Sequence, residues 1–488
     1  MTRIPIRRII LAPLAFLWLT ACATEAEYDA PADLEAFAAR YAAAWSNQDP
    51  AGVASHYSED GSLQVNEAEP SVGRAAITAT AESFMTAFPD MVVALDSLGS
   101  TGERATFHWT WTGTHTGPGG TGKAVKISGH EEWLFGADGR IADSKGHFDE
   151  AEYERQLAGE GPLRQWTFDP GMIFPADGSL TRPEDGIALP DGSLIVVDQV
   201  HGLRRIEADG SHAPFGEMVQ AGYSHEPPEH AGGSNGISLE PGGTHALVAD
   251  IFKGAIYRVD LSSGETEQVY QHRYGVNTAV RDSQGAIWFT QSAHNTPEEG
   301  EARMWATVDV PAPEGALYRL AFEDGRFAET AELLVDSLYF ANGVALDEAR
   351  GALYLAETMG GRVFRYRVDF DAGELSDPLV LVRGVEPDNL ELDVEGMLWV
   401  ALPLANGAIV VDPDTGARHY AFRSVTSAQE EIAEEFVRRG EEGATRLELF
   451  TPDTWAPLPG FVTGVIVGGA DDPVYLTGLG NALVKLDR

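Results

Sequence analysis

The sequence contains a single cysteine, Cys22, so the chain cannot form an internal disulfide and must be stabilised by packing and by any metal it binds. Basic residues are also few, with 34 Lys and Arg against 75 Asp and Glu and a formal net charge of -41. Nucleic-acid backbones and anionic bilayer surfaces bind basic patches, so neither is an expected partner. At 488 residues, 43% of them hydrophobic, the chain is long enough for more than one globular domain.

A hydrophobic run covers residues 9–19 and follows Arg3, Arg7 and Arg8. A positively charged start before a short apolar run is typical of a signal peptide, and this run is too short to span a bilayer comfortably. We therefore exclude the run from the reasoning about fold.

The run ends in Leu19-Thr20-Ala21-Cys22, which resembles the bacterial lipobox. The resemblance implies that Cys22 is diacylated and becomes the mature N-terminus, and Ala23, where Asp would signal retention, argues against the inner membrane. We expect an exported lipoprotein of the bacterial cell envelope, on the periplasmic side and at the outer membrane, with a signal peptide at 1–21 and a linker at 22–32. The alternative is an ordinary cleaved signal with an incidental cysteine.

Residues 33–158 predict an α+β domain with helices first and antiparallel strands after them. Apolar residues recur at helical spacing in DLEAFAARYAAAWSNQD, which ends near Asn47, and in GRAAITATAESFMTAF, which Pro89 closes. Apolar residues alternate in ATFHWTWTGTH and AVKISGHEEWLF, as in strands with one buried face. We expect a curved sheet that wraps one helix.

The stretch SGHEEWLFGADGRIADSKGHFDEAEYERQL resembles the last hairpin and tail of the nuclear-transport-factor-2-like superfamily, in its SnoaL-like branch. The resemblance implies a cone-shaped pocket but names no reaction. We expect Glu131, Trp109 and His147 to face this pocket, where burial of Glu131 would raise its pKa and suit it to proton transfer. The alternative is that Glu131 and His147 lie at a wet rim or pair with each other.

From about Gln165 to the C-terminus, short apolar strands and Gly-containing turns replace the helices. One unit of strand, turn and strand recurs, which predicts an all-β six-bladed propeller over residues 165–488. The C-terminal NALVKLD and the early QWTF are candidates to complete one blade together. The six copies are GIALPDGSLIVVD from Gly186, GISLEPGGTHALVAD from Gly236, TAVRDSQGAIWFT from Thr278, GVALDEARGALYLAE from Gly343, LELDVEGMLWVA from Leu390 and GVIVGGADDPVYLT from Gly464.

The position just ahead of each repeated first strand carries an oxygen-bearing side chain. Because the innermost strands of a propeller begin at one end of its channel, these side chains are expected to converge on the axis. Carboxylate and amide oxygens around one point favour a hard cation such as calcium, whereas zinc prefers His or Cys. The alternative is that Asn and Asp recur because turns recur. The residues are Asp185, Asn235, Asn277, Asn342, Asn389 and Thr463, with Glu184 and Asp388 one position earlier.

The segments RPEDGIAL, ANGVALDEARGALYLAET and EPDNLELDVEGMLWVALP resemble the calcium-dependent propellers that include regucalcin, gluconolactonase, paraoxonase and the strictosidine-synthase-like proteins. The resemblance implies one calcium ion held by Glu184, Asn277, Asn342 and Asp388, with Asn389 as a further ligand in the paraoxonase branch.

Three positions depart from the patterns of those families. Thr278 follows Asn277 where Asp is usual, which argues against a second calcium. Asn235 stands where paraoxonases carry a catalytic His, and Gly275 stands where gluconolactonases carry an Arg. The resemblance therefore does not transfer a substrate to this chain.

These features predict a calcium-dependent hydrolase that acts on small-molecule lactones or related esters, with the metal polarising the carbonyl. Asp388 is the expected proton acceptor for the attacking water, and His294 is the alternative base. We expect Asn235, and Trp305 in an inserted loop, to contact the substrate. A further insertion, TSAQEEIAEEFVRRGEE, is expected to form a charged helical cap.

Three other functions remain open from the sequence. One is a non-catalytic, lipid-anchored binding protein for a small ligand, with a structural calcium ion. Another is a metal-free enzyme of the strictosidine-synthase-like kind. The third places the chemistry in the N-terminal pocket, at Glu131.

Overall fold

The computed structural model describes residues 34–66, 68–101, 104–158, 165–227 and 229–488. It divides into two compact units, Met1–Pro162 and Leu163–Arg488, here called the N-terminal and C-terminal units. The predicted signal peptide and linker, with Cys22, lie outside the described residues. Within the described part of the chain, no helix has the length and apolarity needed to cross a membrane.

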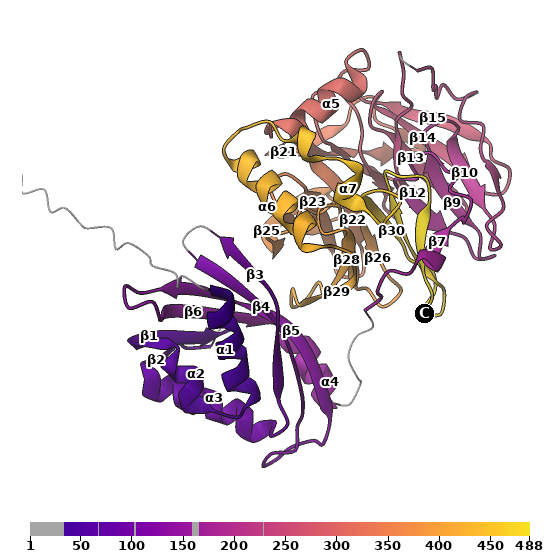
Figure 1. The fold of residues 1–488 in the computed structure, drawn as a ribbon. Helices are drawn as coiled ribbons and strands as arrows, with labels where there is room; N and C mark the ends of the chain where they lie inside the picture. Colours follow the sequence, from indigo (N-terminus) through magenta and orange to yellow (C-terminus); the bar gives the residue numbers. More distant parts are fainter. Residues whose placement is uncertain (1–33, 67, 102–103, 159–164, 228) are drawn as a thin grey trace, which may run out of the picture. The chain divides into compact units, whose positions relative to one another are not determined.

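The N-terminal unit contains one six-stranded sheet in the order β2-β1-β6-β5-β4-β3, together with four helices (Figure 1). The predicted α+β architecture is confirmed, and the two long predicted helices are α1 and α3. The elements are α1 (Leu34–Ser46), α2 (Pro50–Ser55), β1 (Tyr57–Val65), β2 (Ser71–Val72), α3 (Arg74–Ala87), β3 (Val92–Thr101), β4 (Arg104–Thr114), β5 (Ala124–Phe135), β6 (Ile141–Phe148) and α4 (Glu150–Ala158).

Aromatic side chains join α1 to the sheet in the core of this unit. The ring of Tyr41 lies 5.7 Å from that of Phe107 and 5.2 Å from that of Trp133, and all three side chains are fully buried. Edge-to-face contacts of this kind add to the free energy gained by burying the rings.

Strand β1 was not predicted from the sequence. It lies between α2 and α3 along the chain and pairs in parallel with β6, and a bulge between Tyr57 and Ser62 interrupts the alternation of its side chains between the two faces of the sheet.

The C-terminal unit contains six four-stranded sheets and a two-stranded hairpin, β19 (Phe322–Glu323) with β20 (Arg326–Phe327). Each repeated sequence unit supplies the first two strands of one sheet. The sheets are β8 (Gly186–Ala188), β9 (Leu194–Asp198), β10 (Gly202–Ile206) and β11 (His212–Pro214); β12 (Ser234–Leu239), β13 (His245–Asp250), β14 (Ala255–Asp260) and β15 (Thr266–Gln271); β16 (Ala279–Arg281), β17 (Ile287–Gln291), β18 (Gly315–Leu320) and β21 (Glu332–Leu338); β22 (Ala341–Asp347), β23 (Ala352–Glu357), β24 (Arg362–Asp369) and β25 (Glu374–Arg383); β26 (Leu390–Leu392), β27 (Leu398–Leu402), β28 (Gly407–Val411) and β29 (Arg418–Arg423); and β30 (Val462–Ile466), β31 (Val474–Gly478), β32 (Leu483–Leu486) and β7 (Ile173–Phe174).

The first strands of the six sheets form a closed cycle. Strands β8, β12, β16, β22, β26 and β30 each contact the next in this order, and β30 contacts β8. The two chain ends of the unit meet in the last sheet, where β32 pairs with β7 through Leu483 and Phe174. The arrangement is consistent with the predicted propeller.

The closing strand differs from the one suggested by the sequence. It is Ile173–Phe174, whereas Trp166 of QWTF forms a parallel bridge with Phe422 in the neighbouring sheet. Phe174 is favoured at the closure because its ring also packs 5.5 Å from that of Tyr475 in β31.

Neighbouring first strands approach each other closely at glycines. A Cβ atom on Gly236 would lie 2.8 Å from the Asn277 carbonyl oxygen, and one on Gly343 would lie 2.7 Å from the Asn389 Cα. Neither glycine has a positive φ, and the Asn-Gly pairs lie within β12 and β22. Their recurrence therefore reflects strand packing, and the explanation by turns is wrong for Asn235 and Asn342.

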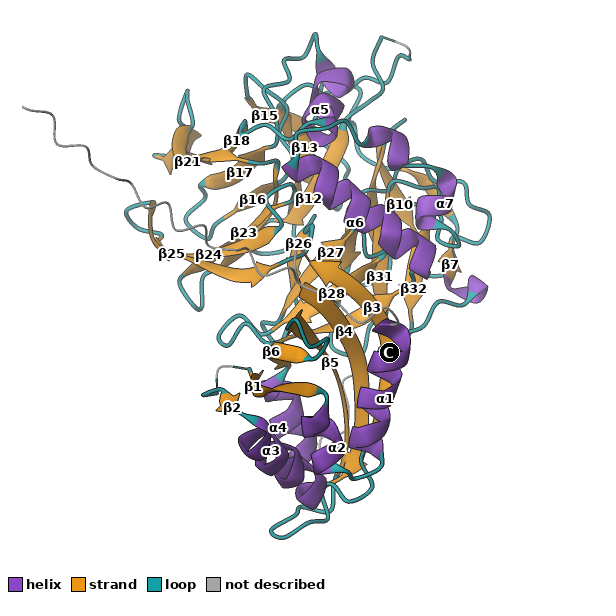
Figure 2. Ribbon diagram, turned by 60° about the vertical axis from the view of Figure 1, so that its left-hand side comes forward, coloured by secondary structure: helices purple, strands orange, loops and turns teal. Residues whose placement is uncertain are grey.

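Three helices of the C-terminal unit lie outside the sheets: α5 (Gly300–Asp309), α6 (Ser427–Glu441) and α7 (Pro452–Trp455). Figure 2 shows α5 and α6 as long purple helices in front of the strands of this unit. The predicted helical insertion is α6, which begins with a capping box between Thr426 and Gln429. Buried side chains of α5 and α6 pack in one apolar cluster, Met304 and Val308 with Phe436.

The buried Asp282 carboxylate, in the turn between β16 and β17, should contribute strongly to the stability of the C-terminal unit. The Asp282 carboxylate accepts the indole N–H of fully buried Trp288 at 2.8 Å and the Ala286 backbone N–H at 2.8 Å. Asp282→Ala should lower the free energy of unfolding by about 2–4 kcal/mol, because buried donors lose their acceptor. Urea unfolding followed by fluorescence would measure this loss. Exposed Asp471→Ala is the control, and equal losses in both variants would contradict the assignment.

Candidate functional site

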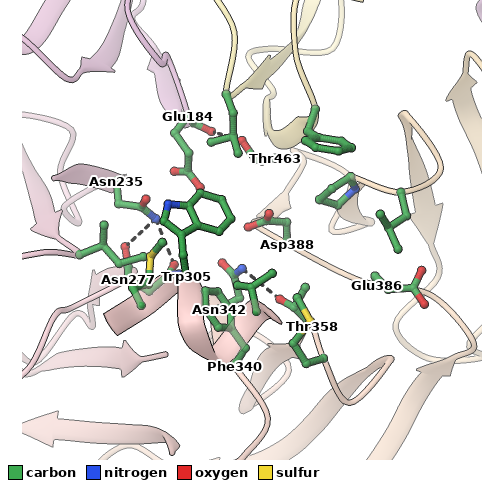
Figure 3. Close-up of a pocket in the computed structure, with 18 of the residues that line it drawn as sticks. Glu184, Asn235, Asn277, Trp305, Phe340, Asn342, Thr358, Glu386, Asp388 and Thr463 are labelled. Atoms are coloured by element: carbon green, nitrogen blue, oxygen red, sulfur yellow. Dashed lines mark hydrogen bonds between the residues drawn. The ribbon is translucent and has the colours of Figure 1, made fainter. Parts of the chain in front are cut away.

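A cavity opens where the first strands of the C-terminal unit begin. Its volume is about 80 Å³, and its floor carries most of the predicted oxygen ligands (Figure 3). One polar lining residue, Glu386, is half-buried, and Figure 3 shows its carboxylate pointing away from the polar groups of the floor. The remaining polar lining residues are Arg182, Glu184, Asn235, Asn277, Asn342, Thr358, Asp388 and Thr463.

The floor residues are placed by the starts of different sheets. Glu184 and Asp388 precede β8 and β26 by two residues, and Asn277 precedes β16 by the same spacing. Asn235 and Asn342 are the second residues of β12 and β22. Each of these side chains is at most 8% exposed, so residues far apart in sequence share one buried space.

Hydroxyl groups behind the floor orient the amides of Asn342 and Asn277. The Asn342 Nδ2 donates to Thr358 Oγ1 at 3.0 Å, and the Asn277 Nδ2 donates to Ser292 Oγ at 3.0 Å. Both hydroxyl residues directly follow the second strand of their sheet. With its nitrogen held from behind, Asn342 leaves its amide oxygen without a partner among the described residues, whereas the Asn277 oxygen accepts from Thr278 Oγ1 at 3.0 Å and Asn235 Nδ2 at 3.3 Å.

Two acceptor oxygens on the floor have no partner among the described residues. They are Asn342 Oδ1 and Asp388 Oδ1, both buried. Leaving a buried acceptor unsatisfied costs about 1–3 kcal/mol, and more for a charged group. The floor therefore presents oxygens that a bound group would satisfy.

Two carboxylates share this buried space. Burial raises the pKa of Glu184 to about 7, although the Arg182 charge opposes the rise. Burial, and then the charge of Glu184, raise the pKa of Asp388 well above its usual range. A cation between the two groups would offset both effects, since it stabilises the ionised forms.

Asp185 and Asn389 do not line the cavity. Asp185 Oδ2 accepts a hydrogen bond from the Ile237 backbone N–H at 3.0 Å, so this carboxylate satisfies a backbone donor of the neighbouring strand β12. The Asn389 Nδ2 donates to Glu184 at 3.3 and 3.4 Å, and its Oδ1 accepts from Thr278 Oγ1 at 3.1 Å. With its nitrogen toward Glu184, Asn389 supports that carboxylate, and a ligand role would require its amide to turn.

His294 is not brought to the cavity. Its side chain is exposed, and its ring stacks on Tyr274 with centroids 4.7 Å apart. The structure therefore does not support His294 as the alternative base.

Trp305, in contrast, lines the cavity, and Figure 3 shows its indole drawn in front of the ring of polar groups.

Arg182 is a site residue that sequence reasoning missed. Its Nη2 donates to Asn235 Oδ1 at 3.1 Å, its guanidinium lies 5.5 Å from the Phe252 ring centroid, and its buried Nη1 has no partner among the described residues. The signal was present, because Arg182 lies two residues before Glu184 in RPEDG. A free guanidinium donor beside the floor can bind a negatively charged oxygen.

The walls of the cavity are apolar. Helix α5 contributes Met304, Trp305 and Val308, and Phe436 of α6 packs over the cavity with its ring 4.8 Å from that of Phe450. The predicted cap is thus part of the cavity wall as well as a charged surface. The other apolar lining residues include Phe340, Met359, Leu404, Phe461 and Leu479.

In the N-terminal unit, Glu131 lies inside the core as predicted but is fully engaged there. Its carboxylate accepts from Trp133 Nε1 at 2.9 Å, Ser144 Oγ at 2.8 Å and Tyr41 Oη at 3.1 Å. Burial raises its pKa. The side chain is 7% exposed, so it does not lie at a wet rim. This network supports a structural role.

The expectation for His147 is wrong. In β5 and β6, Glu131 pairs with Gly146 and His130 pairs with His147, so His147 lies on the opposite face of the sheet from Glu131. The two side chains therefore neither share a pocket nor pair. Trp109 does lie on the inner face, buried, with an indole N–H that has no partner among the described residues.

Replacing Glu131 should change how the stability of the N-terminal unit depends on pH. Because burial raises the folded-state pKa above the usual 4.5, stability is highest with the carboxyl protonated and falls as pH rises through the folded pKa. In Glu131→Gln this dependence should disappear, and the difference should reach about 1.4 kcal/mol per pH unit between the unfolded and folded pKa. Urea unfolding from pH 4 to 8 would measure it.

Exposed Glu82→Gln in the same unit is the matched control and should follow the wild type at every pH. A constant difference between wild type and Glu131→Gln across the range would contradict the assigned titration.

Comparisons with known proteins bear on both units. Residues 35–157 match the family model of the SnoaL-like polyketide cyclases, and residues 257–427 match the SMP-30/Gluconolactonase/LRE-like region. The solved structure of a gluconolactonase from Xanthomonas campestris shares 18% identity, covers 63% of this chain and 86% of its own, and has a TM-score of 0.43.

Two curated relatives match part of the chain. The protein named "Putative sugar lactone lactonase YvrE" of Bacillus subtilis is 30% identical over 170 residues, 33% of this chain and 52% of its own. Strictosidine synthase-like 6 of Arabidopsis thaliana is 25% identical over 252 residues, 50% of this chain and 62% of its own. The chain thus spans about half to three fifths of these relatives. It combines an N-terminal SnoaL-like domain with a C-terminal SMP-30/gluconolactonase-like region.

Proposed function

We propose that the C-terminal unit is a six-bladed propeller that acts as a calcium-dependent hydrolase of lactones or related esters. The observation that carries the proposal is the pair of buried, unpartnered acceptors, Asn342 Oδ1 and Asp388 Oδ1, beside the Glu184 carboxylate. The gluconolactonase-like region and a relative named as a sugar lactone lactonase support lactones as the substrate class.

The donor set fits calcium. Calcium takes six to eight oxygen ligands, and carboxylate and amide oxygens are among its usual partners. Glu184, Asn277, Asn342 and Asp388 would hold the ion, and substrate or water would complete its shell. The described cavity residues include no His or Cys, which a zinc site would favour.

The chain's own residues complete the proposed chemistry. When bound, the cation polarises the substrate carbonyl and stabilises negative charge on its oxygen. The unpartnered Arg182 Nη1 donates a hydrogen bond to this developing charge. Asp388 accepts the proton of the attacking water through the carboxylate oxygen that does not hold the ion, and it returns this proton to the leaving alkoxide as the acyl C–O bond breaks.

The apolar walls orient the rest of the substrate and exclude bulk water. Met304 and Phe436 reach the cavity from two helices, so an alkyl or aryl group of the substrate can be buried between them.

Lipid anchoring through Cys22 remains a prediction, and membrane attachment would depend on it alone.

Calcium-dependent turnover is the first test. The full chain should hydrolyse members of a lactone and aryl-ester panel in a pH-stat, and chelation should abolish the activity. Glu184→Ala and Asn342→Ala should each lower kcat/KM by about 100-fold or more, because each removes an oxygen that holds the ion. Asp471→Ala, an exposed substitution, should leave kcat/KM unchanged.

Turnover that persists in both ligand variants would overturn the mechanism. Calcium binding without turnover on any ester would instead identify a binding protein with a structural ion.

Substrate preference should follow the apolar walls. Each added methylene in the acyl side chain of a lactone is worth about 0.8 kcal/mol when buried, so kcat/KM should rise about fourfold per carbon until the space is filled. Phe436→Ala should flatten this series, because it removes an aromatic wall. Exposed Val437→Ala, the next residue on α6, is the matched control. A series that is equally steep in Phe436→Ala and wild type would exclude this wall.

A further inference from the structure

A row of histidines crosses the outer face of the N-terminal sheet. In the antiparallel register, His108 of β4 is opposite His130 of β5, and His130 is opposite His147 of β6. The alternating burial of β5 places Glu131 and Trp133 in the core and leaves His130 and Glu132 on the other face. The row is therefore set by strand pairing, and it belongs to no part of the proposed lactonase site.

Three side chains of this face come together closely. The ligand atoms of His130, Glu132 and His147 all lie within 4.8 Å of one another, and the His130 and His147 ring centroids are 4.9 Å apart. All three residues are half-buried. In the part of the chain that the structure describes, this is the one group of three or more His, Cys, Asp or Glu residues with such proximity.

The chemistry of the group differs from that of the cavity floor in the C-terminal unit. Two imidazoles and a carboxylate suit borderline first-row divalent ions, above all zinc and cobalt, whereas calcium prefers oxygen alone. Glu132 is opposite Lys145 across β5 and β6, and a carboxylate oxygen of Glu132 lies within 4.8 Å of a ring nitrogen of each of the two histidines.

We propose that His130, Glu132 and His147 form a zinc-class metal site on the outer face of the N-terminal sheet. A zinc–nitrogen bond of about 2.1 Å implies ligand atoms about 3.4 Å apart in a tetrahedron. The three atoms need to approach by roughly 1 Å, which rotation of half-buried side chains provides. Three protein ligands leave a fourth position open to water or to an anionic ligand.

The geometry of the strands pre-organises the site. His130 and Glu132 are two residues apart in one strand, so they share a face, and His147 is fixed beside them by the β5–β6 pairing. Little backbone freedom is lost on binding, because the three Cα positions are already held by the sheet.

The test uses Co²⁺ and Zn²⁺ with the full chain, freed of any affinity tag, in a buffer with excess calcium to occupy oxygen-only sites. Co²⁺ titration should give an intense visible absorption of tetrahedral character at one equivalent, and Zn²⁺ should displace it. His130→Ala and His147→Ala should each weaken Zn²⁺ binding by at least tenfold in calorimetry. Glu132→Gln should also weaken Zn²⁺ binding.

Two matched controls isolate these ligands. His115→Ala removes a half-buried imidazole of the same unit that stacks on Phe88, and Glu82→Gln removes an exposed carboxylate of α3. Both should bind Zn²⁺ as the wild type does. Asn342→Ala should also leave Co²⁺ absorption unchanged, which separates this site from the proposed calcium site.

The thermal melt gives a readout that does not depend on the spectra. Zn²⁺ should raise the melting temperature of the wild type and of His115→Ala but not of His130→Ala, since binding to the folded state stabilises it. If His130→Ala does not fold, Glu132→Gln, which keeps the side-chain shape, decides the question. Binding of less than half an equivalent, or equal affinity in wild type and all three ligand variants, would overturn the proposal.

Discussion

The close approach of successive first strands is the constraint on which the C-terminal site depends. Gly236 and Gly343 leave no room for a Cβ against the neighbouring strand, and the backbone N–H of Gly236 donates to the Asn277 carbonyl at 2.9 Å. Because β12 and β22 are held this way against β16 and β26, the residues at these strand starts must converge. A larger residue at either glycine would separate two sheets and the side chains they carry.

Convergence by itself would only crowd polar groups together, and a second layer gives them direction. Thr358 and Ser292 hold the amide nitrogens of Asn342 and Asn277 from behind, and the Asn342 oxygen is left without a partner among the described residues. The result is a buried floor whose acceptors outnumber its donors, with Arg182 as the cation beside it. Such a floor is costly while unfilled and favourable around a bound cation, which is the physical basis for preorganised electrostatic catalysis.

The hydrogen bonding of a buried carboxylate differs between the two units. Around Glu131, hydroxyl and indole donors satisfy the carboxylate, so the group stabilises a packed core. Around Asp388, one oxygen is left without a partner among the described residues. Burial raises the pKa in both cases, so the unfilled hydrogen-bonding capacity, rather than the pKa, distinguishes a candidate site from a structural network.

The sequence by itself determined the two-unit architecture, the six repeats and most of the cavity floor, because these follow from local periodicity and from residues at fixed places in a repeat. Only the tertiary structure decided which partners those residues meet. The register of β5 and β6 places His147 on the outer face, and His294 is exposed and does not line the cavity. The last sheet is closed by Ile173–Phe174. Register, ring closure and long-range pairing depend on contacts between distant segments, which local pattern does not encode.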